Sequence, residues 1–156
     1  MAAIQQQLVA VQGIVRSYAP SDVYNCDETG LFCKRLPEKD LSTQSIPGQK
    51  QSKARITLHF CCNATGSDKP PIWFIGKSVR PRAFGTAQVH LSALDCVWKS
   101  NGAAWMTTEI MAQWLYWFDQ KMQSRRVLLV MDNFSAHSSA VDNIMTSRPL
   151  QNVTII

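Results

Sequence analysis

One run of apolar residues constrains the fold of this chain more than any other feature. The run spans residues 127–131 (VLLVM), and an acidic residue, Asp132, follows it directly. Five residues suit a buried strand and fall far short of the roughly 20 that a membrane-spanning helix needs. The run therefore predicts a strand inside a sheet, with a carboxylate held at the strand's end.

Other short segments carry the alternation or the apolar runs that are typical of strands. Together with the run above, they predict strands at residues 23–27, 56–62, 72–75, 97–98, 127–131 and 153–156. The first strand is expected to end at Asp27, since Thr29 and Gly30 mark its exit. The turn at 63–68 makes residues 53–76 a hairpin, whereas the polar stretch 34–52 is predicted to be a loop.

Helical spacing of apolar residues predicts helices at 1–19, 107–122 and 138–146. The first carries its apolar stripe on Ile4, Leu8, Val11 and Val15. In the second, Thr107 is a suitable N-cap and Glu109 lies in the first turn, where a carboxylate favours the helix dipole. Strands and helices in this order predict a mixed α/β fold, with a sheet covered by helices.

Length and composition place the chain among single globular domains. It has 156 residues, of which 46% are hydrophobic and only 17% charged, which excludes a disordered, highly charged tail. The net charge of +5 fits a surface that meets phosphate without requiring one. No apolar run could span a membrane, and the N-terminus lacks the basic start of a secretory signal.

The five cysteines contain no Cys-x-x-Cys pair. A structural zinc site needs a closed set of four ligands. Cys61 and Cys62 should point to opposite faces of one strand, so joint ligation, even with His59, is not expected. Reduced structural cysteines are predicted instead.

Asp27 and Asp132 are the strongest candidates for chemistry, because each is expected to end a strand. A carboxylate there is costly to ionise unless a cation lies nearby. On neighbouring strands the two could bind Mg²⁺, which prefers carboxylate oxygens and water. Strand-end aspartates are also common turn and helix caps, and from the pattern alone the capping role is favoured.

Three further sets of residues admit two interpretations each. Ser135, His137 and Asp132 could form a hydrolase triad, but a G-x-S-x-G elbow is missing. Ser135 and His137 more readily organise the turn into a helix.

Trp114 and Trp117 lie on an apolar helix face and should pack in the core, whereas Trp105 could also stack on a base. A group of basic residues could contact phosphate or be solvated surface charge: Lys53, Arg55, Lys69, Lys77, Arg80 and Arg82.

Ordered motifs along the chain resemble those of the pogo/Tigger-like DDE superfamily endonucleases, the group that includes centromere protein B and jerky-type proteins. Residues 24–32 (YNCDETGLF) resemble the family's N-x-DETGLF motif. In the same order as in the family follow 53–57 (KARIT), 63–70 (NATGSDKP), 75–78 (IGKS) with Pro81-Arg82, 105–107 (WMT), Trp114-Leu115, and 128–133 (LLVMDN) with Ser135 and His137.

The resemblance implies a ribonuclease-H-like mixed sheet with flanking helices, incomplete at its C-terminus. Residues 1–20 are then a lead-in, and 21–156 part of a DDE-type catalytic domain. It implies that Asp27 and Asp132 are catalytic acids that bind Mg²⁺ or Mn²⁺, and that the partner is DNA in the nucleus. Such enzymes cleave and join DNA strands by two-metal chemistry. Lys53, Arg55, Lys77, Arg80 and Arg82 are the expected DNA contacts.

The sequence also departs from the family pattern. The family's third acid follows a proline-rich segment beyond the strand that starts near Val153, and the sequence ends at Ile156. Asp142 lies too early to replace it. The helix-turn-helix units that usually precede the domain are also missing. Activity of the chain itself is therefore left open, and the alternative is an inactive transposon remnant or a domesticated nucleic-acid-binding domain.

Overall fold

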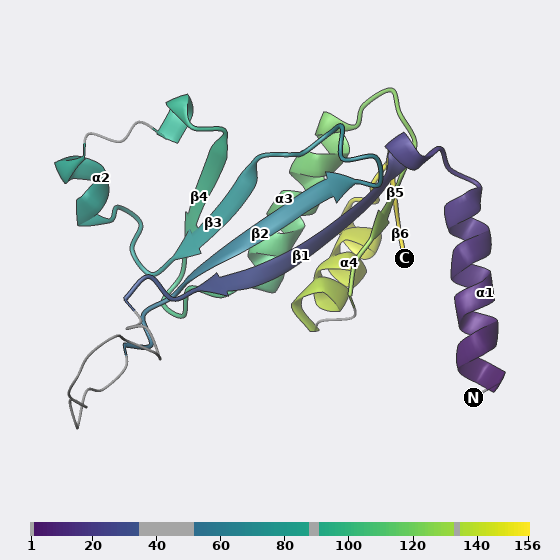
Figure 1. Ribbon diagram of the computed structural model, residues 1–156, viewed down its shortest axis with the longest axis horizontal. Coiled ribbons are helices and arrows are strands. Elements are labelled where there is room, and N and C mark those ends of the chain that lie inside the picture. Colours follow the sequence, from purple (N-terminus) through teal and green to yellow (C-terminus); the bar gives the residue numbers. More distant parts are fainter. Residues whose placement is uncertain (1, 35–51, 88–90, 133–134) are drawn as a thin grey trace, which may run out of the picture.

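The computed structural model describes residues 2–34, 52–87, 91–132 and 135–156 (Figure 1). A six-stranded sheet forms the framework, in the order β4-β3-β2-β1-β5-β6. Its strands are β1 (Val23–Leu31), β2 (Ile56–Asn63), β3 (Ile72–Gly76), β4 (Cys96–Ser100), β5 (Val127–Val130) and β6 (Val153–Ile155). The predicted mixed α/β fold and the hairpin of β2 and β3 are confirmed.

The strand directions bring several chain segments to one end of the sheet. β1 pairs antiparallel with β2 and parallel with β5, while β3 pairs antiparallel with β2 and parallel with β4. The last residues of β1, β3 and β4 therefore lie at the same end as the first residue of β2, whereas β5 points the same way but stops level with Asn25. We call this the site end; it is marked by Leu31, Ile56, Gly76 and Ser100.

Strand β1 is longer than predicted, and the expected exit at Thr29-Gly30 is wrong. β2 pairs with β1 without a break from Tyr24 to Leu31, so the polar residues in between stay in the ladder. Asp27 is thus in the middle of β1 and not at its end. The neighbouring β5 is shorter, however, and its last pair with β1 joins Asn25 to Val130. Asp27 consequently lies beyond the end of β5.

Helices α3 (Thr108–Lys121) and α4 (Ser135–Ser147) lie on one face of the sheet (Figure 1). The Thr107 side chain caps α3 by accepting a hydrogen bond from the Ile110 amide, as predicted. Ring contacts join Trp114 of α3 to His59 and Phe118 to Tyr24. Trp114 is fully buried, which confirms its packing role. α4 begins earlier than the predicted residue 138, so Ser135 and His137 belong to its first turn.

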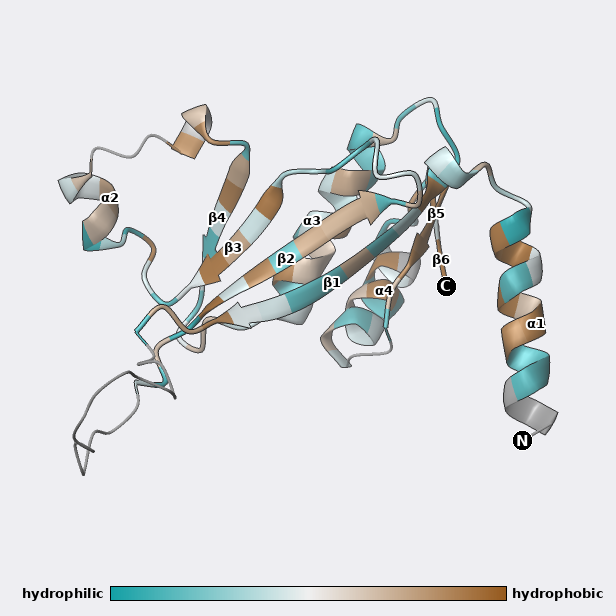
Figure 2. Cartoon of the chain, viewed as in Figure 1, coloured by the Kyte–Doolittle hydropathy of each residue, from teal (hydrophilic) through white to brown (hydrophobic). Residues whose placement is uncertain are grey.

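The predicted strand β2 is confirmed, but the side that is buried is the polar one. Thr57, His59 and Cys61 are buried, whereas Phe60 is 42% exposed and Cys62 is also exposed. The reason is that α3 and α4 cover the face that carries His59. Figure 2 shows the matching polar middle of β1 within this sheet. The burial of one cysteine and exposure of the next confirm that Cys61 and Cys62 point to opposite faces.

Helix α1 (Ala2–Arg16) confirms the predicted N-terminal helix and stands beside the sheet (Figure 1). It ends before residue 19, and a 3-10 turn at Pro20–Asp22 leads into β1. Within its predicted apolar stripe, Leu8 is 55% and Val11 40% exposed, and Val15 is half-buried. No described helix is both long and apolar enough to cross a membrane.

The stretch between β3 and β4 contains two short helical turns. They are α2 (Arg82–Thr86) and a 3-10 turn at Leu91–Ala93. The loop predicted for residues 34–52 falls, from 35 to 51, outside the described residues.

The Asp119 carboxylate ties the last turn of α3 to the entry of β6. Its Oδ1 accepts hydrogen bonds from the backbone amides of Gln151, Asn152 and Val153 at 2.7–3.2 Å. The Asn152 side chain donates to the Asp119 carbonyl at 3.1 Å. An anionic acceptor strengthens each of these bonds, so this one side chain holds β6 against β5.

We predict that Asp119→Ala lowers the free energy of unfolding by about 2–3 kcal/mol, because three backbone amides, two of them partly buried, lose a charged acceptor. Urea unfolding followed by circular dichroism measures the change. Gln120→Ala, at an exposed position of the same helix, is the control and should have almost no effect. Equal stability of the two variants would contradict the role given to Asp119.

Candidate functional site

The fold brings Asp27 and Asp132 to the same pocket at the site end. The parallel register places Asn25 beside Val130, and each aspartate follows two residues later. Both line a pocket of about 260 Å³, together with Glu28, Arg55 and Trp105. Asp27 is exposed, and the Asp132 side chain is 64% exposed. The pair therefore faces solvent at a place where a ligand can enter.

Each aspartate has one oxygen held by a nearby donor. The backbone amide of Glu28 donates to Asp27 Oδ1 at 2.7 Å. Asp132 Oδ1 lies 2.7 Å from Nδ1 of His137, which comes from the first turn of α4. These contacts orient the two carboxylates, one through the backbone and one through a side chain.

Glu28 is the half-buried centre of the site, and no sequence pattern indicated its role. Its Oε1 accepts hydrogen bonds from His59 Nδ1 at 2.7 Å and from His137 Nε2 at 3.1 Å. The ring of His59 is fully buried and packs edge-on against Trp114, with 4.4 Å between the centroids. Asp132, His137, Glu28 and His59 thus form one chain of contacts, which we call the His–Glu network.

The charges in this network are mutually dependent. Burial alone would raise the pKa of Glu28, but the hydrogen bonds and charges of His137 and His59 outweigh it and lower the pKa to about 2. Burial alone would lower the pKa of His137, but Glu28 and Asp132 outweigh it and raise the pKa. An ionised carboxylate can only accept hydrogen bonds, so His137 needs a proton on both nitrogens to serve both acids. The geometry therefore favours an imidazolium between two carboxylates.

This arrangement excludes the serine hydrolase alternative. A catalytic histidine needs one ring nitrogen to take the proton of the serine hydroxyl. In His137, Nδ1 contacts Asp132 and Nε2 contacts Glu28. Ser135 lies two residues earlier, at the start of α4, and His137 has no nitrogen left to act as its base.

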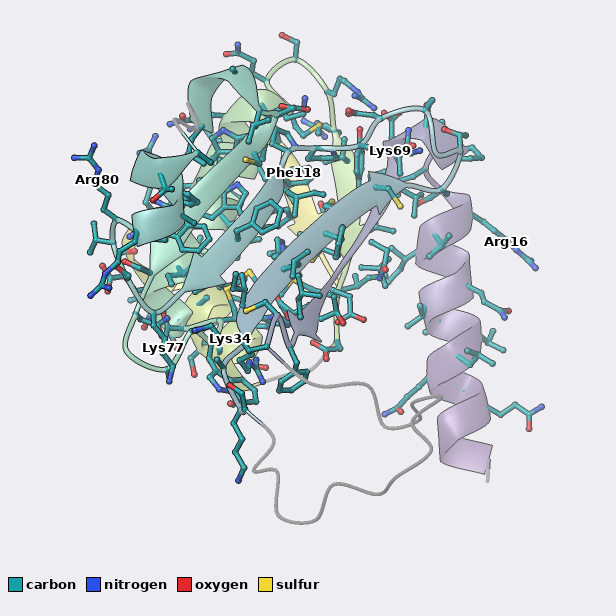
Figure 3. The ribbon with its side chains drawn as sticks, turned by 60° about the vertical axis from the view of Figure 1, so that its left-hand side comes forward. Arg16, Lys34, Lys69, Lys77, Arg80 and Phe118 are labelled. Atoms are coloured by element: carbon teal, nitrogen blue, oxygen red, sulfur yellow. The ribbon has the colours of Figure 1, made fainter. Side chains whose placement is uncertain are left out.

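Five of the six basic residues considered from the sequence lie in or next to segments of the site end. Lys53 and Arg55 precede β2, and Lys77 directly follows β3. Arg80 lies between β3 and α2, and Arg82 begins α2. Lys69 departs from the expected cluster, because it lies between β2 and β3 at the opposite end of the sheet. Figure 3 shows Lys77 and Lys69 at these opposite ends.

Arg55 reaches the pocket of the two aspartates. Its guanidinium carbon lies 3.6 Å from the centroid of the Trp105 ring, and its Nη2 donates to Thr57 Oγ1 at 2.8 Å. Of the five predicted DNA contacts, Arg55 lines the same pocket as Asp27 and Asp132. It places a fixed positive charge beside the two acids.

The donors present fit only part of a metal site. Among the described residues, no three or more His, Cys, Asp or Glu side chains are arranged to hold a metal ion. Two solvent-facing carboxylates are nevertheless a set that Mg²⁺ and Mn²⁺ accept, because such ions keep water and take phosphate oxygens as further ligands. Glu28 is not a third ligand in this arrangement, since it is bound by two histidines.

The cysteines contribute no ligands to the site. All five are free, and Cys26 and Cys61 are buried on neighbouring strands. Burial raises the pKa of both thiols, so they are poor metal ligands and poor nucleophiles. This agrees with the structural role predicted for them.

Comparison with known proteins identifies close relatives of the sequence. A model of the family described as DDE superfamily endonuclease matches residues 53–156. CENP-B homolog protein 2 of Schizosaccharomyces pombe is 44% identical over 97% of the chain and 30% of its own length. ARS-binding protein 1 of the same organism is 43% identical over 96% of the chain and 29% of its own length. The chain therefore spans about a third or less of the relatives it matches.

Comparison of structures confirms the fold. The Mos1 transposase paired-end complex with left transposon end aligns with a TM-score of 0.52 over 94% of this chain and 38% of the other, at 11% identity. The Mos1 mariner paired end complex with Mn gives the same TM-score at 14% identity. At this identity the likeness shows the fold alone, and it bears out the predicted ribonuclease-H-like mixed sheet with flanking helices.

We predict that Glu28→Gln changes the dependence of stability on pH. The folded pKa of Glu28 is about 2 and lies below the ordinary value of 4.5. The ionised carboxylate therefore contributes to the free energy of unfolding above pH 4.5, and this contribution is lost as the pH falls towards 2. The pKa of His137 is raised above 6.5, so its contribution is complete below pH 6.5 and is lost as the pH rises through the folded value. Both residues therefore contribute fully to the stability of the fold between about pH 4.5 and pH 6.5.

Urea unfolding of the wild type and Glu28→Gln at about pH 3, 5.5 and 8 tests this linkage. Near pH 5.5 the free energy of unfolding of the variant should be lower than that of the wild type by on the order of 3 kcal/mol, and the difference should be smaller at pH 3 and pH 8. Glu109→Gln makes the same change in charge at an exposed position of α3 and serves as the control. A loss for Glu28→Gln that is constant over the three pH values would rule out the charged network.

Proposed function

Because the chain belongs to the DDE superfamily endonuclease family, we propose that it is a transposase-derived domain that binds DNA at the site end of its sheet. Asp27 and Asp132 are the proposed catalytic acids and ligands of a divalent cation, Mg²⁺ or Mn²⁺. The observation that carries the proposal is the shared pocket of these two acids, with Arg55 in its wall. In this proposal, residues 21–156 form the catalytic-type domain and residues 1–20 its lead-in.

The site's own residues have distinct roles in this proposal. Asp27 and Asp132 provide hard oxygen ligands, and Arg55 attracts the phosphate and offsets its charge. His137 is a positioning residue, because it holds Asp132 from one side while Glu28 and His59 hold His137 from the other. A bound cation would activate the attacking oxygen and stabilise the leaving oxygen of a phosphodiester.

The choice of DNA as partner is supported by charge and by the relatives. Lys53, Arg55 and Lys77 gather at the site end, and Arg80 and Arg82 extend the positive charge towards α2. One relative is named for binding ARS, and human major centromere autoantigen B, named for the centromere, is 34% identical over 80% of the chain and 20% of its own length. The fold matches that of a transposase in complex with a transposon end. A nuclear location accompanies this proposal.

One observation favours binding without cleavage as the second candidate. Glu28 is the third acid in the pocket, and it is held by His59 and His137. Within residues 2–34, 52–87, 91–132 and 135–156, no further acid completes a cluster of three. Plasmid nicking with Mn²⁺ separates the candidates: nicking that is lost in Asp27→Asn and Asp132→Asn supports the enzyme, and DNA binding without nicking supports the binding domain.

We predict weak binding of Mn²⁺ by the wild-type chain and at least about tenfold weaker binding by Asp132→Asn, because one of two ligands loses its charge. Titration calorimetry measures both without any need for activity. Asp95→Asn removes the same charge from an exposed position just before β4 and is the matched control. Equal affinities of the Asp132 and Asp95 variants would contradict the proposed ligand set.

We also predict that DNA binding depends on salt through the basic residues of the site end. Each of Lys53→Gln and Lys77→Gln should lower the slope of log K against log salt concentration by about 0.7–0.9, because each removes one phosphate contact. Fluorescence anisotropy with a labelled oligonucleotide measures the slope. Arg126, exposed at the start of β5 and thus at the opposite end, is the control. A similar effect of Arg126→Gln would show that only the net charge matters.

A further inference from the structure

Trp105 is exposed inside the candidate site, unlike the tryptophans of the core. Its side chain is 48% exposed, whereas Trp73 is 3% exposed and Trp114 is fully buried. It lines the pocket that also contains Asp27 and Asp132. Leaving a large aromatic ring in water forgoes the burial that normally stabilises it. The position is therefore better explained by a ligand than by packing.

The loop that carries Trp105 is held firmly. The Asn101 side chain accepts hydrogen bonds from the backbone amides of Ala103 and Trp105 and donates to the Trp105 carbonyl at 2.6 Å. Ala104 has a positive φ of 55°, and its carbonyl accepts a 2.7 Å hydrogen bond from the buried Thr57 hydroxyl. These bonds fix the backbone on both sides of the ring, so the exposed indole is presented by a fixed loop.

The Arg55 guanidinium lies over one face of the Trp105 ring. Its carbon lies 3.6 Å from the ring centroid, in the stacked arrangement that arginine forms with tryptophan. The hydrogen bond from Arg55 Nη2 to Thr57 joins this pair to the same hydroxyl that braces Ala104. Arg55 Nε is buried and has no hydrogen-bond partner among the described residues. The pair thus combines a π surface, a positive charge and an unused donor.

We propose that the Arg55–Trp105 pair is a stacking site for an unpaired nucleobase, whose adjoining phosphodiester lies at Asp27 and Asp132. The inference rests on the proposed function, since the phosphodiester is its other half. A nucleotide matches the site because it joins a flat π face for Trp105 to a negative charge for Arg55. The site accepts any of the four bases, since stacking is tolerant of sequence.

The base has to be unpaired because both faces of a base inside a duplex are already stacked on their neighbours. A base can reach the pair only in a single strand, at a frayed end, or after it has turned out of the helix. The pocket's volume of about 260 Å³ and its two acids leave room beside the ring for one nucleotide. The site therefore fixes one nucleotide next to the phosphate under attack.

The test compares two single-stranded DNA probes of equal length, one with bases and one with abasic sugars throughout its centre. The wild type should bind the probe with bases about 5–100-fold more tightly, the range expected for one stacked base. Trp105→Ala should bind both probes with nearly equal affinity, close to that of the wild type for the abasic probe. Trp105→Phe, which keeps an aromatic ring, should recover part of the preference.

Two further variants separate stacking from charge and from folding. Arg55→Lys keeps the charge but loses the planar stack, so it should lose part of the preference and keep the binding to the abasic probe. The preference of Tyr18→Ala, which removes a partly exposed ring ahead of the 3-10 turn that leads into β1, should match the wild type. Tryptophan emission adds a direct measurement: the base-containing probe should quench the wild type more than Trp105→Phe.

The outcomes distinguish this inference from the proposed function. Binding of both probes with equal affinity by the wild type would overturn the stacking site and leave DNA binding intact. A preference that survives in Trp105→Ala would place the base elsewhere and also overturn it. Failure of the wild type to bind either probe would overturn the proposed function and this inference with it.

Discussion

The half-buried carboxylate of Glu28 is the constraint on which the rest of the site depends. Withdrawing a carboxylate from water is costly unless it is paired and hydrogen-bonded. Here the pairing comes from His59 on β2 and His137 on α4, so the sheet and the helix that covers it must meet at this point. His137 in turn contacts Asp132. The solvent-facing acid is thus oriented by a network that begins inside the core.

The same constraint explains why the polar side of β2 is buried. If Phe60 and Cys62 faced the helices, His59 would point away from Glu28 and leave the carboxylate without its partner. The strand instead buries Thr57, His59 and Cys61, and each has a use. Thr57 braces the loop before α3, His59 pairs with Glu28 and packs on Trp114, and Cys61 fills the core.

The sequence alone was sufficient for the strands, the longer helices α1, α3 and α4, and the family, because local patterns determine them. The apolar run of β5, the cap of α3 at Thr107 and the ordered motifs were all identified correctly. Three features depend on contacts between segments that are distant in the sequence, and no local pattern contains them. They are the buried side of β2, the length of β1 and the role of Glu28. One signal was present: His59 and Glu28 are polar residues within predicted strand segments, and such residues need a partner.

In the function proposed above, Asp27 and Asp132 converge on one cation site while the His–Glu network stays intact. A crystal structure of the chain grown with Mn²⁺, with the ion located by anomalous scattering, would show whether they do. We expect an ion in contact with oxygens of both aspartates, with His137 still bonded to Glu28. An ion bound to Glu28 or His137, or aspartates too far apart to share an ion, would contradict this expectation.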